Sequence, residues 1–464
     1  MTAASITPSL EEIHHSVPIP QRWWRRFLAF SGPALMVSVG YMDPGNWGTD
    51  LEAGSKFGPR LIWVLLMSNM MALLLQGLAT RLGVVAGRDL AQACRESYPR
   101  RTVFALWALT EIAIAATDLA EVIGTIIALK LLFDLPYLIG LAIAATDTLL
   151  LLALQRRGVR LLELLTLGLV AVIAGSFVVE IVLARPDWAA VLRGFTPGLD
   201  PRQPGDSLYV AIAMLGATVM PHNLYLHSAL VQTRAFPQTH AGKRLACKYN
   251  LIDSALALNG AFFINAAILV LAVTTFYQHG KEVDKLHDAY RLLGEVWGTT
   301  AASLLFAVAL LASGQSSTLT GTLAGQVVME GFVRLRVRPW VRRLLTRLAA
   351  IVPALLVLVL ASANESQADV VDERLLQLLV LSQAILSFQL PFAIIPLVQF
   401  TSDRRRMGEF ANPSWLKGLA WLCAVIIVGL NVVLIWLQTD KWAGAAAEAG
   451  RHPLWVYGTL GPVA

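Results

Sequence analysis

The sequence predicts an all-α polytopic membrane protein that is built from two inverted repeats. Of its 464 residues, 56% are hydrophobic and only 15% are charged, whereas soluble domains are about 45–50% apolar and about 25% charged. Apolar runs of about 20 residues recur along the chain, and this length crosses a bilayer core of roughly 30 Å. Two of these runs are interrupted by a tetrapeptide that contains a proline.

Eleven membrane spans are predicted from the apolar runs and from the charged loops between them. The spans cover residues 30–57, 61–83, 102–130, 135–154, 160–184, 207–233, 249–278, 298–333, 344–362, 375–400 and 416–438. Spans one to five form a first repeat at 30–184, and spans six to ten form a second repeat at 207–400. Span eleven, at 416–438, is an addition outside the repeats.

The basic residues predict the orientation of the chain. With the N-terminal segment (1–29) in the cytoplasm, 25 of the 37 Lys and Arg residues fall on the cytoplasmic side, as the positive-inside rule expects. Trp23 and Trp24 then adjoin three arginines as an interfacial anchor, and the tail at 439–464 lies outside. The basic residues that give the net charge of +6 therefore indicate topology, and no nucleic-acid partner is expected.

The two repeats are expected to have opposite orientations, because each contains an odd number of spans. The break falls in the first span of each repeat. An inverted repeat of five plus five helices with discontinuous first helices is the pattern of the LeuT-like fold. In that pattern the substrate site lies near the middle of the bilayer, between the two broken helices.

The breaks have the sequences Asp43-Pro44-Gly45-Asn46 and Met220-Pro221-His222-Asn223 and lie 177 positions apart. Proline removes a backbone donor and disrupts a helix. Polar or unwound backbone at membrane depth survives only where it is buried in protein or lines a cavity. The backbone carbonyls that are expected to lose their helical partners and to become available to a cation are those of Gly40, Tyr41 and Ala217.

The side chains at the breaks indicate the type of cation. Asp43 offers a carboxylate, Asn46 an amide oxygen and Met220 a thioether. Oxygen ligands alone suit Mg²⁺ or Ca²⁺, but a thioether favours softer transition metals. The expected substrates are Mn²⁺ and Fe²⁺, with Co²⁺, Ni²⁺, Zn²⁺ or Cd²⁺ as further candidates. Gln383, central in the tenth span, is the best candidate for one more oxygen ligand. The competing interpretations are that Met220 only fills the core and that Asp43 only caps a helix.

Three acidic residues of the third span, Glu111, Asp118 and Glu121, share one helical face. Carboxylates at membrane depth are costly unless they line water or meet cations. We therefore expect a proton route that leads from Asp43 along the third span. The basic partners expected near the inner end of the ninth span are Arg342, Arg343 and Arg347. A static salt-bridge network that seals the bundle is the alternative.

Two histidines follow the second break. His222 is expected to contribute to the water pathway or to hold the unwound segment, and less readily to bind metal. For His227, proton handling and a structural role are both open, because a histidine inside a membrane protein often serves only as a hydrogen-bonding group.

Four stretches together resemble the Nramp (natural resistance-associated macrophage protein) family of divalent metal transporters. They are Gly40-Tyr41-Met42-Asp43-Pro44-Gly45-Asn46 in the first span, residues 217–227 in the sixth, residues 312–331 in the eighth and residues 389–393 in the tenth. The likeness extends from about residue 27 to 438. Relatives that carry magnesium or aluminium lack the methionine, so Met220 argues against those branches.

This resemblance implies proton-coupled import of Mn²⁺ and Fe²⁺ by alternating access. It implies that Asp43, Asn46, Met220 and the Ala217 carbonyl bind the metal, and that the acids of the third span carry protons. It also implies a carrier in the plasma membrane, in particular a bacterial inner membrane. We expect it to be monomeric, to perform no enzymatic chemistry and to hold no permanently bound cofactor.

Three alternative functions fit the same outline. A channel would need a continuous pore lining, and the paired broken helices argue for a carrier. A sodium-coupled amino-acid transporter of this fold would prefer a glycine-rich break that binds a carboxylate, and the pairing of Asp43 with Met220 argues against it. A membrane-embedded metalloenzyme would need a ligand cluster such as H-E-x-x-H, which the sequence lacks.

Overall fold

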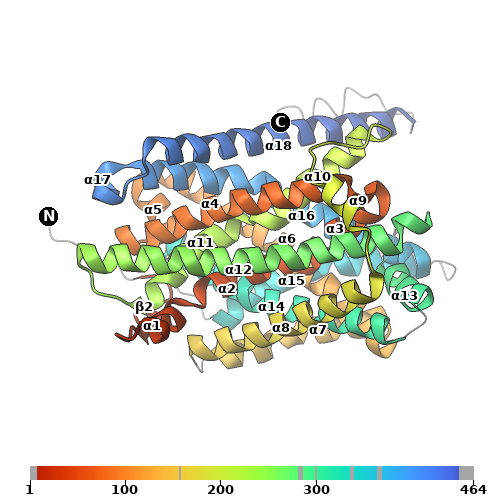
Figure 1. Ribbon diagram of the computed structural model, residues 1–464, viewed down its shortest axis with the longest axis horizontal. Helices are drawn as coiled ribbons and strands as arrows, with labels where there is room; N and C mark the ends of the chain where they lie inside the picture. The colour runs from red at the N-terminus through yellow and green to blue at the C-terminus, as the bar shows by residue number, and fades with distance from the viewer. Residues whose placement is uncertain are drawn as a thin grey trace.

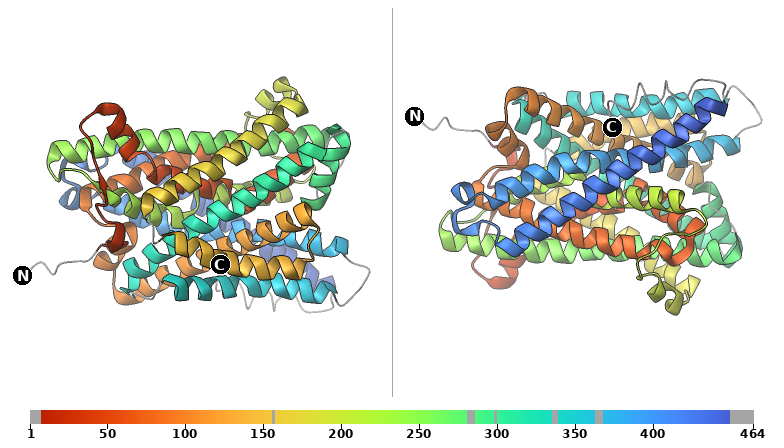
Figure 2. Two further views of the ribbon diagram at one scale, coloured as in Figure 1. Left: turned by 90° about the horizontal axis from the view of Figure 1, so that it is seen from below. Right: turned by 90° about the horizontal axis from the view of Figure 1, so that it is seen from above.

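The computed structural model describes residues 8–155, 158–280, 286–297, 300–334, 339–362 and 368–448. Long helices dominate these residues and run roughly along one axis of the molecule (Figure 1). Two views from below and above place α18 and α8, whose bounds follow, on opposite sides of the bundle (Figure 2).

In the first half of the chain the elements are η1 (Glu11–Ile13), β1 (Val17–Pro18), α1 (Trp23–Phe30), α2 (Pro33–Ser38), η2 (Val39–Met42), α3 (Pro44–Phe57), η3 (Gly58–Leu61), α4 (Ile62–Ala86), α5 (Leu90–Ser97), α6 (Arg100–Phe133), α7 (Tyr137–Gln155), α8 (Val159–Ala184) and α9 (Trp188–Arg193). In the second half they are α10 (Pro204–Val219), α11 (Pro221–Leu230), η4 (Val231–Thr233), β2 (Arg234–Ala235), α12 (His240–Thr275), η5 (Tyr277–His279), α13 (Leu286–Trp297), α14 (Thr300–Val333), α15 (Pro339–Ser362), α16 (Ala368–Ser402), α17 (Arg404–Met407), η6 (Gly408–Phe410) and α18 (Ser414–Glu448).

Each predicted span corresponds to a helix or to a pair of half-helices. The first span is formed by α2, η2 and α3, and the sixth by α10 and α11. Among the described residues, eight helical stretches are long and apolar enough to cross a membrane. The helices α7 and α15 contain the shorter apolar stretches Tyr137–Asp147 and Leu344–Val359.

Both breaks lie where they were predicted. Asp43 caps α3, because its Oδ1 accepts the backbone N–H of Asn46 at 2.8 Å, and Pro44 begins the helix, where a missing N–H costs nothing. Met220 ends α10 with a φ of +27°, a conformation that is strained for a residue with a side chain, and Pro221 begins α11. The second helix therefore stops and restarts at Met220, whereas in the first the 3-10 turn η2 lies between α2 and Asp43.

The structure differs from the expectations in three respects. Two residues of β1 pair in parallel with two of β2, so the fold is not purely helical. The last helix, α18, continues to Glu448 instead of ending at Gln438, and residues 449–464 of the predicted tail lie outside the described part of the chain. The short helices α5, α9 and α13 were not predicted, and they lie in the loops at the two ends of the bundle (Figure 1).

The start of the first broken helix and the end of the second are joined near the N-terminal segment. β1, before α2, pairs with β2, which follows α11. Arg234 in β2 donates to the Ser31 carbonyl at 3.0 Å and to Glu163 of α8 at 2.8 Å. Asp253 of α12 accepts the backbone N–H of Ala34 at 3.0 Å, at the start of α2. We call this arrangement of β1, β2, Arg234 and Ser31 the strand clip.

The buried pair of Glu163 and Arg234 generates a stability prediction. Glu163→Ala removes the carboxylate partner of a fully buried guanidinium, and breaking such a pair costs about 3–5 kcal/mol. The melting temperature of the detergent-solubilised protein should fall by several degrees. The control is Glu96→Ala, because the Glu96–Arg88 pair is about one third exposed and exposed pairs contribute about 0–1 kcal/mol. Equal shifts for the two variants would contradict the prediction.

Candidate cation site between the broken helices

The side-chain amide of Asn46 lies at the centre of the predicted site. Its Nδ2 donates to Oδ1 of Asp43 at 2.6 Å, to the carbonyl of Gly40 at 3.1 Å and to the carbonyl of Ala217 at 3.0 Å. These three oxygens come from both broken helices. The structure thus brings together three of the predicted oxygen ligands around a single donor group.

The backbone carbonyls near the first break are bonded to side chains in place of their helical partners. Asn265 of α12 donates to the carbonyl of Tyr41 at 2.6 Å. The carbonyl of Met42 accepts the indole N–H of Trp47 at 3.2 Å and the Ser313 hydroxyl at 2.5 Å. Buried carbonyls need such partners, so the unwound segment is held by amides, an indole and a hydroxyl.

Met220 contacts the first break through Gly40. A methyl group added to Gly40 would lie 2.9 Å from Sδ of Met220 and 2.3 Å from Nδ2 of Asn223. Asn223 donates to the Met220 sulfur at 3.6 Å and to the carbonyl of Val37 at 3.3 Å. The thioether therefore faces the segment that carries Asp43, as predicted.

The two asparagines occupy equivalent places in the two repeats. Each stands three residues after the break and donates to the side chain at its own break, Asp43 for Asn46 and Met220 for Asn223. Each also donates to a backbone carbonyl of the opposite broken helix. The approximate symmetry of the repeats is therefore reproduced in the hydrogen bonds of the site.

The site is closed to solvent in this structure. Asp43, Ala217 and Met220 are 0% exposed and Asn46 is 1% exposed. Oδ2 of Asp43 is buried without a hydrogen bond to any described residue. Within the described residues, no cluster of three or more His, Cys, Asp or Glu side chains is arranged to hold a metal. A cation here would thus be held by one carboxylate together with amide, carbonyl and thioether groups.

Gln383 of α16 lies directly against the first break. A methyl group on Gly45 would overlap its side-chain amide. Its Nε2 donates to the Ser382 hydroxyl at 2.9 Å, and its Oε1 is buried without a hydrogen bond among the described residues. Gln383 therefore offers a free oxygen beside the site, in agreement with its predicted position; its role as a ligand stays a prediction.

The acidic residues of α6 meet the predicted arginines of α15. Glu111 pairs with Arg342 at 2.9 Å, and Glu121 pairs with Arg347 at 3.2 Å. The side chain of Arg343 lies outside the described part of the structure. These contacts fit both a proton route and a static seal, so the predicted role of the acids remains open.

Asp118 and the two predicted histidines are buried side chains of neighbouring helices. Asp118 of α6 and His227 of α11 are 0% exposed, His222 of α11 is 2% exposed, and α6 packs against α11. Nδ1 of His227 is 2.9 Å from Oε1 of Gln76 in α4. The structure therefore places His227 against α4, and the proton role of Asp118 and His222 stays a prediction.

Two residues of these networks were not selected from the sequence. Asp147 of α7 shares Arg347 with Glu121, at 3.1 Å from the guanidinium. Asn223 was not predicted as a site residue, although its position matches that of Asn46 in the other tetrapeptide. That matching position was the signal that could have found it.

A buried set of converging oxygens with a thioether beside them, between two broken helices of an inverted repeat, is the arrangement expected of a membrane carrier. The chain belongs to the Nramp family, because the family described as natural resistance-associated macrophage protein-like matches residues 34–437. A Nostoc sp. protein named divalent metal cation transporter MntH is 53% identical over 445 residues, which are 95% of this chain and 99% of the relative. A Xanthomonas campestris protein of the same name is 55% identical over 426 residues, 91% and 94% of the two chains.

Solved structures agree with this membership. The manganese transporter of Eremococcus coleocola, crystallised with an aromatic bis-isothiourea compound, superposes with a TM-score of 0.86 at 38% identity, over 94% of this chain and 92% of that one. Mhp1, a nucleobase-cation-symport transporter, matches with a TM-score of 0.60 at 12% identity, over 94% and 96% of the chains, which shows the fold alone. The predicted LeuT-like fold is confirmed, and the chain is a divalent metal cation transporter and not an enzyme.

The symmetric role of Asn223 is testable. Asn223→Leu keeps the approximate size of the side chain but leaves the Val37 carbonyl without its donor, at a cost of about 1–3 kcal/mol. We expect roughly a tenfold loss of apparent affinity for divalent cations in liposome uptake. Asn431→Leu is the control, because Asn431 also donates to a buried carbonyl, that of Ser387 at 2.8 Å, but in α18. Equal losses would show that only general stability is affected.

Proposed function

We propose that this chain imports Mn²⁺ and Fe²⁺ by alternating access, with protons as the coupled ion. One observation carries the proposal: Asp43, Gly40 and Ala217 direct three oxygens at one amide, and the sulfur of Met220 lies beside them. An oxygen set with a thioether fits a transition metal better than it fits Mg²⁺ or Ca²⁺. Asp43, Asn46, Met220 and the Ala217 carbonyl are the proposed ligands.

Asn46 is the proposed ligand whose side-chain amide changes its bonding partners when a cation binds. In the occluded structure its N–H groups satisfy the oxygens of Asp43, Gly40 and Ala217. A cation that enters takes over those oxygens and repels the amide nitrogen. Rotation of the amide then presents Oδ1 to the cation, so one side chain fills the site in the absence of metal and binds the metal when it arrives.

The barriers on the two sides of the site are helix contacts at glycines. A methyl group on Gly54 of α3 would lie 2.6 Å from the Leu269 carbonyl of α12, and one on Gly83 of α4 would lie 2.1 Å from the Ser228 carbonyl of α11. Gly54 follows the first break and Ser228 follows the second, so the inverted repeat places them on opposite sides of the site. Separation of one contact at a time is the proposed form of alternating access.

Proton coupling is proposed to involve Asp118 and His222. Both side chains are buried, on α6 and α11, and these two helices pack against each other. Glu111 and Glu121 of the same helix as Asp118 are paired with arginines. Asp118 is the proposed proton carrier because its helix packs against the second broken helix.

The proposed transport is inward, from outside the cell to the cytoplasm. An inward-negative potential favours entry by about 2.3 kcal/mol per charge per 100 mV. We propose a cytoplasmic N-terminus, an external C-terminus and a monomer in the plasma membrane. The metal is cargo, and no resident cofactor is proposed.

Met220 is predicted to set the selectivity. Met220→Ala removes the soft ligand, so uptake of Mn²⁺ and Cd²⁺ into liposomes under a pH gradient should fall at least tenfold relative to Mg²⁺ and Ca²⁺. Met214→Ala is the control, because Met214 is also buried but packs in an apolar cluster separate from the one that contains Met220. If Met220→Ala keeps full discrimination against Mg²⁺ and Ca²⁺, the ligand role of the sulfur is refuted.

Asp118 is predicted to carry the coupled proton. Asp118→Asn keeps the shape of the side chain but cannot ionise, so metal-driven acidification of the liposome lumen should fall at least fivefold while some metal uptake remains. Asp134→Asn, at the exposed end of the same helix, should match the wild type. Unchanged proton flux in Asp118→Asn would eliminate this route and favour a static salt-bridge network.

A further inference from the structure

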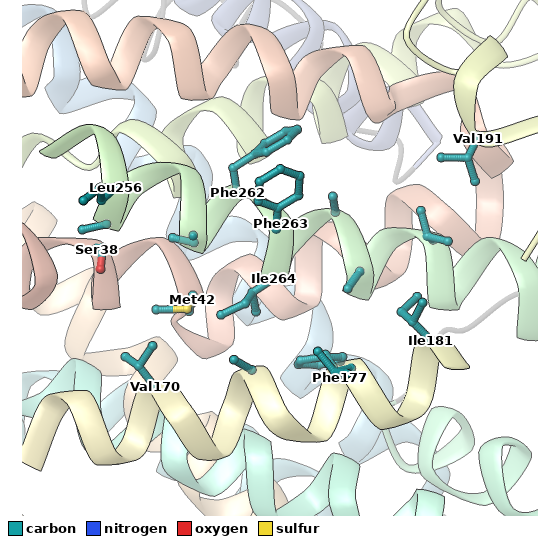
Figure 3. A pocket seen from close by; sticks show the side chains of 18 of the residues that line it. Ser38, Met42, Val170, Phe177, Ile181, Val191, Leu256, Phe262, Phe263 and Ile264 are labelled. Carbon is teal, nitrogen blue, oxygen red and sulfur yellow. The ribbon is translucent and has the colours of Figure 1, made fainter. Parts of the chain in front are cut away.

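An apolar groove opens along the side of the molecule between α8 and α12. It has a volume of about 700 Å³. Val170, Phe177 and Ile181 of α8 face Leu256 and Ile264 of α12 across it, and Met42 of the first broken helix lies between the two helices (Figure 3). The groove therefore reaches from the surface of the bundle to the residue beside Asp43.

The chemistry of the lining excludes water as a stable occupant. The lining side chains are carbon apart from the sulfur of Met42, the hydroxyl of Ser38 and, at the α9 end, the indole N–H of Trp188. The Ser38 hydroxyl already donates to the Leu35 carbonyl at 2.8 Å. A buried water needs about two to four polar partners. The stretch of the groove between α8 and α12 does not offer that many, so its occupant there must be apolar.

The position of the groove identifies the occupant as lipid. Only 22% of the membrane-spanning window of α8 is buried inside the protein, so this helix faces the bilayer. Val178 and Val182 of α8 and Phe263 of α12, all on the groove wall, are exposed by 64%, 68% and 68%. In a membrane-embedded chain these surfaces are covered by acyl chains.

The end of the groove at α9 has residues typical of the membrane–water interface. Trp188 and Leu192 of the short helix α9 line it and are 58% and 68% exposed. Tryptophan is enriched at the level of the lipid headgroups. A lipid whose headgroup lies beside α9 would extend its acyl chain along α8 toward Met42.

The inner end of the groove contacts the residues that hold the first break. Phe177, on the groove wall, packs against Trp47 with ring centroids 4.9 Å apart. The Trp47 indole donates to the Met42 carbonyl. An acyl chain in the groove would thus touch Met42 directly and Trp47 through Phe177.

We propose that this groove is a lipid-binding site in which one phospholipid acyl chain, entering from the α9 end, braces the unwound segment at Met42. Ser38 and Met42 of the broken helix are each only 1% exposed at the bottom of the groove, so the lipid would fill the seam between α8 and α12 above them. Movement of the first broken helix then depends on the lipid that occupies the groove.

Photo-crosslinking tests the site. The protein is reconstituted with phosphatidylethanolamine that carries a diazirine near the end of one acyl chain, and crosslinked peptides are mapped. We expect labelling of α8 and α12 around Phe177 and Ile264 to exceed labelling of the lipid-facing side of α18 at least fivefold. Equal labelling of all lipid-facing helices would overturn the proposal.

Glycine substitutions separate the groove from the general lipid surface. Gly260 lines the groove, and a side chain added there meets open space, so Gly260→Trp should fill the groove and reduce groove labelling about tenfold. Gly429→Trp, at a glycine of α18 that is also open, should leave groove labelling unchanged. Gly260→Leu provides a smaller substitution if the tryptophan variant does not fold. Persistent labelling in a folded Gly260 variant refutes the site.

Transport assays test the brace. The Gly260 variant that has lost groove labelling should change the maximal rate of Mn²⁺ uptake at least threefold, with its apparent affinity for Mn²⁺ nearly unchanged, because the cation ligands are untouched. If the variant takes up Mn²⁺ at the wild-type rate, the groove still binds lipid, but the proposal that this lipid supports Met42 is refuted. A large loss of affinity for Mn²⁺ would show that the substitution disturbs the proposed cation ligands. That result would contradict a lipid that acts only on Met42 and leaves those ligands unchanged.

Discussion

Two asparagine amides hold the broken helices of this transporter together. Asn46 and Asn223 each bond the side chain of their own break and a backbone carbonyl of the other broken helix. Unwound backbone at membrane depth is costly unless its polar groups are satisfied. These amides satisfy it and at the same time fix the distance between the helices. The geometry of the oxygens and of the sulfur follows from this pair of cross-links.

A site held by amides is well suited to transient binding. A cage of carboxylates would hold a divalent ion tightly and would be highly charged when empty. In the proposed site a single carboxylate, Asp43, lies among neutral groups, and the Asn46 amide donates hydrogen bonds to the converging oxygens. Only one formal charge is therefore buried between the two breaks in this arrangement of the named groups. The surrounding ion pairs of Glu111 and Glu121 lie on α6 and α15, outside the broken helices.

The fold and the centre of the site were predictable because their signals are local. Proline beside polar residues inside an apolar run marks a break, and counting spans between two breaks gives the inversion. What depends on three-dimensional neighbours was not predictable. Asn46 was expected to offer its oxygen, and in the occluded structure it offers its N–H groups, because three acceptors converge on it. Asp147 gained a partner only because α7 packs against α15. The pairing of β1 with β2 is too short to leave a periodic pattern, and α18 extends through an alanine-rich stretch that hydropathy undervalues but helix propensity favours.

The strand clip links the beginning of one half-helix to the end of another. β1 lies just before α1 and α2, β2 follows α11, and Arg234 donates a hydrogen bond to the Ser31 carbonyl between them. If α2 or α11 swung away alone, this linkage would have to break. With the linkage intact, α2 and α11 are mechanically coupled, so a displacement of one half-helix is transmitted to the other and shared between the two repeats.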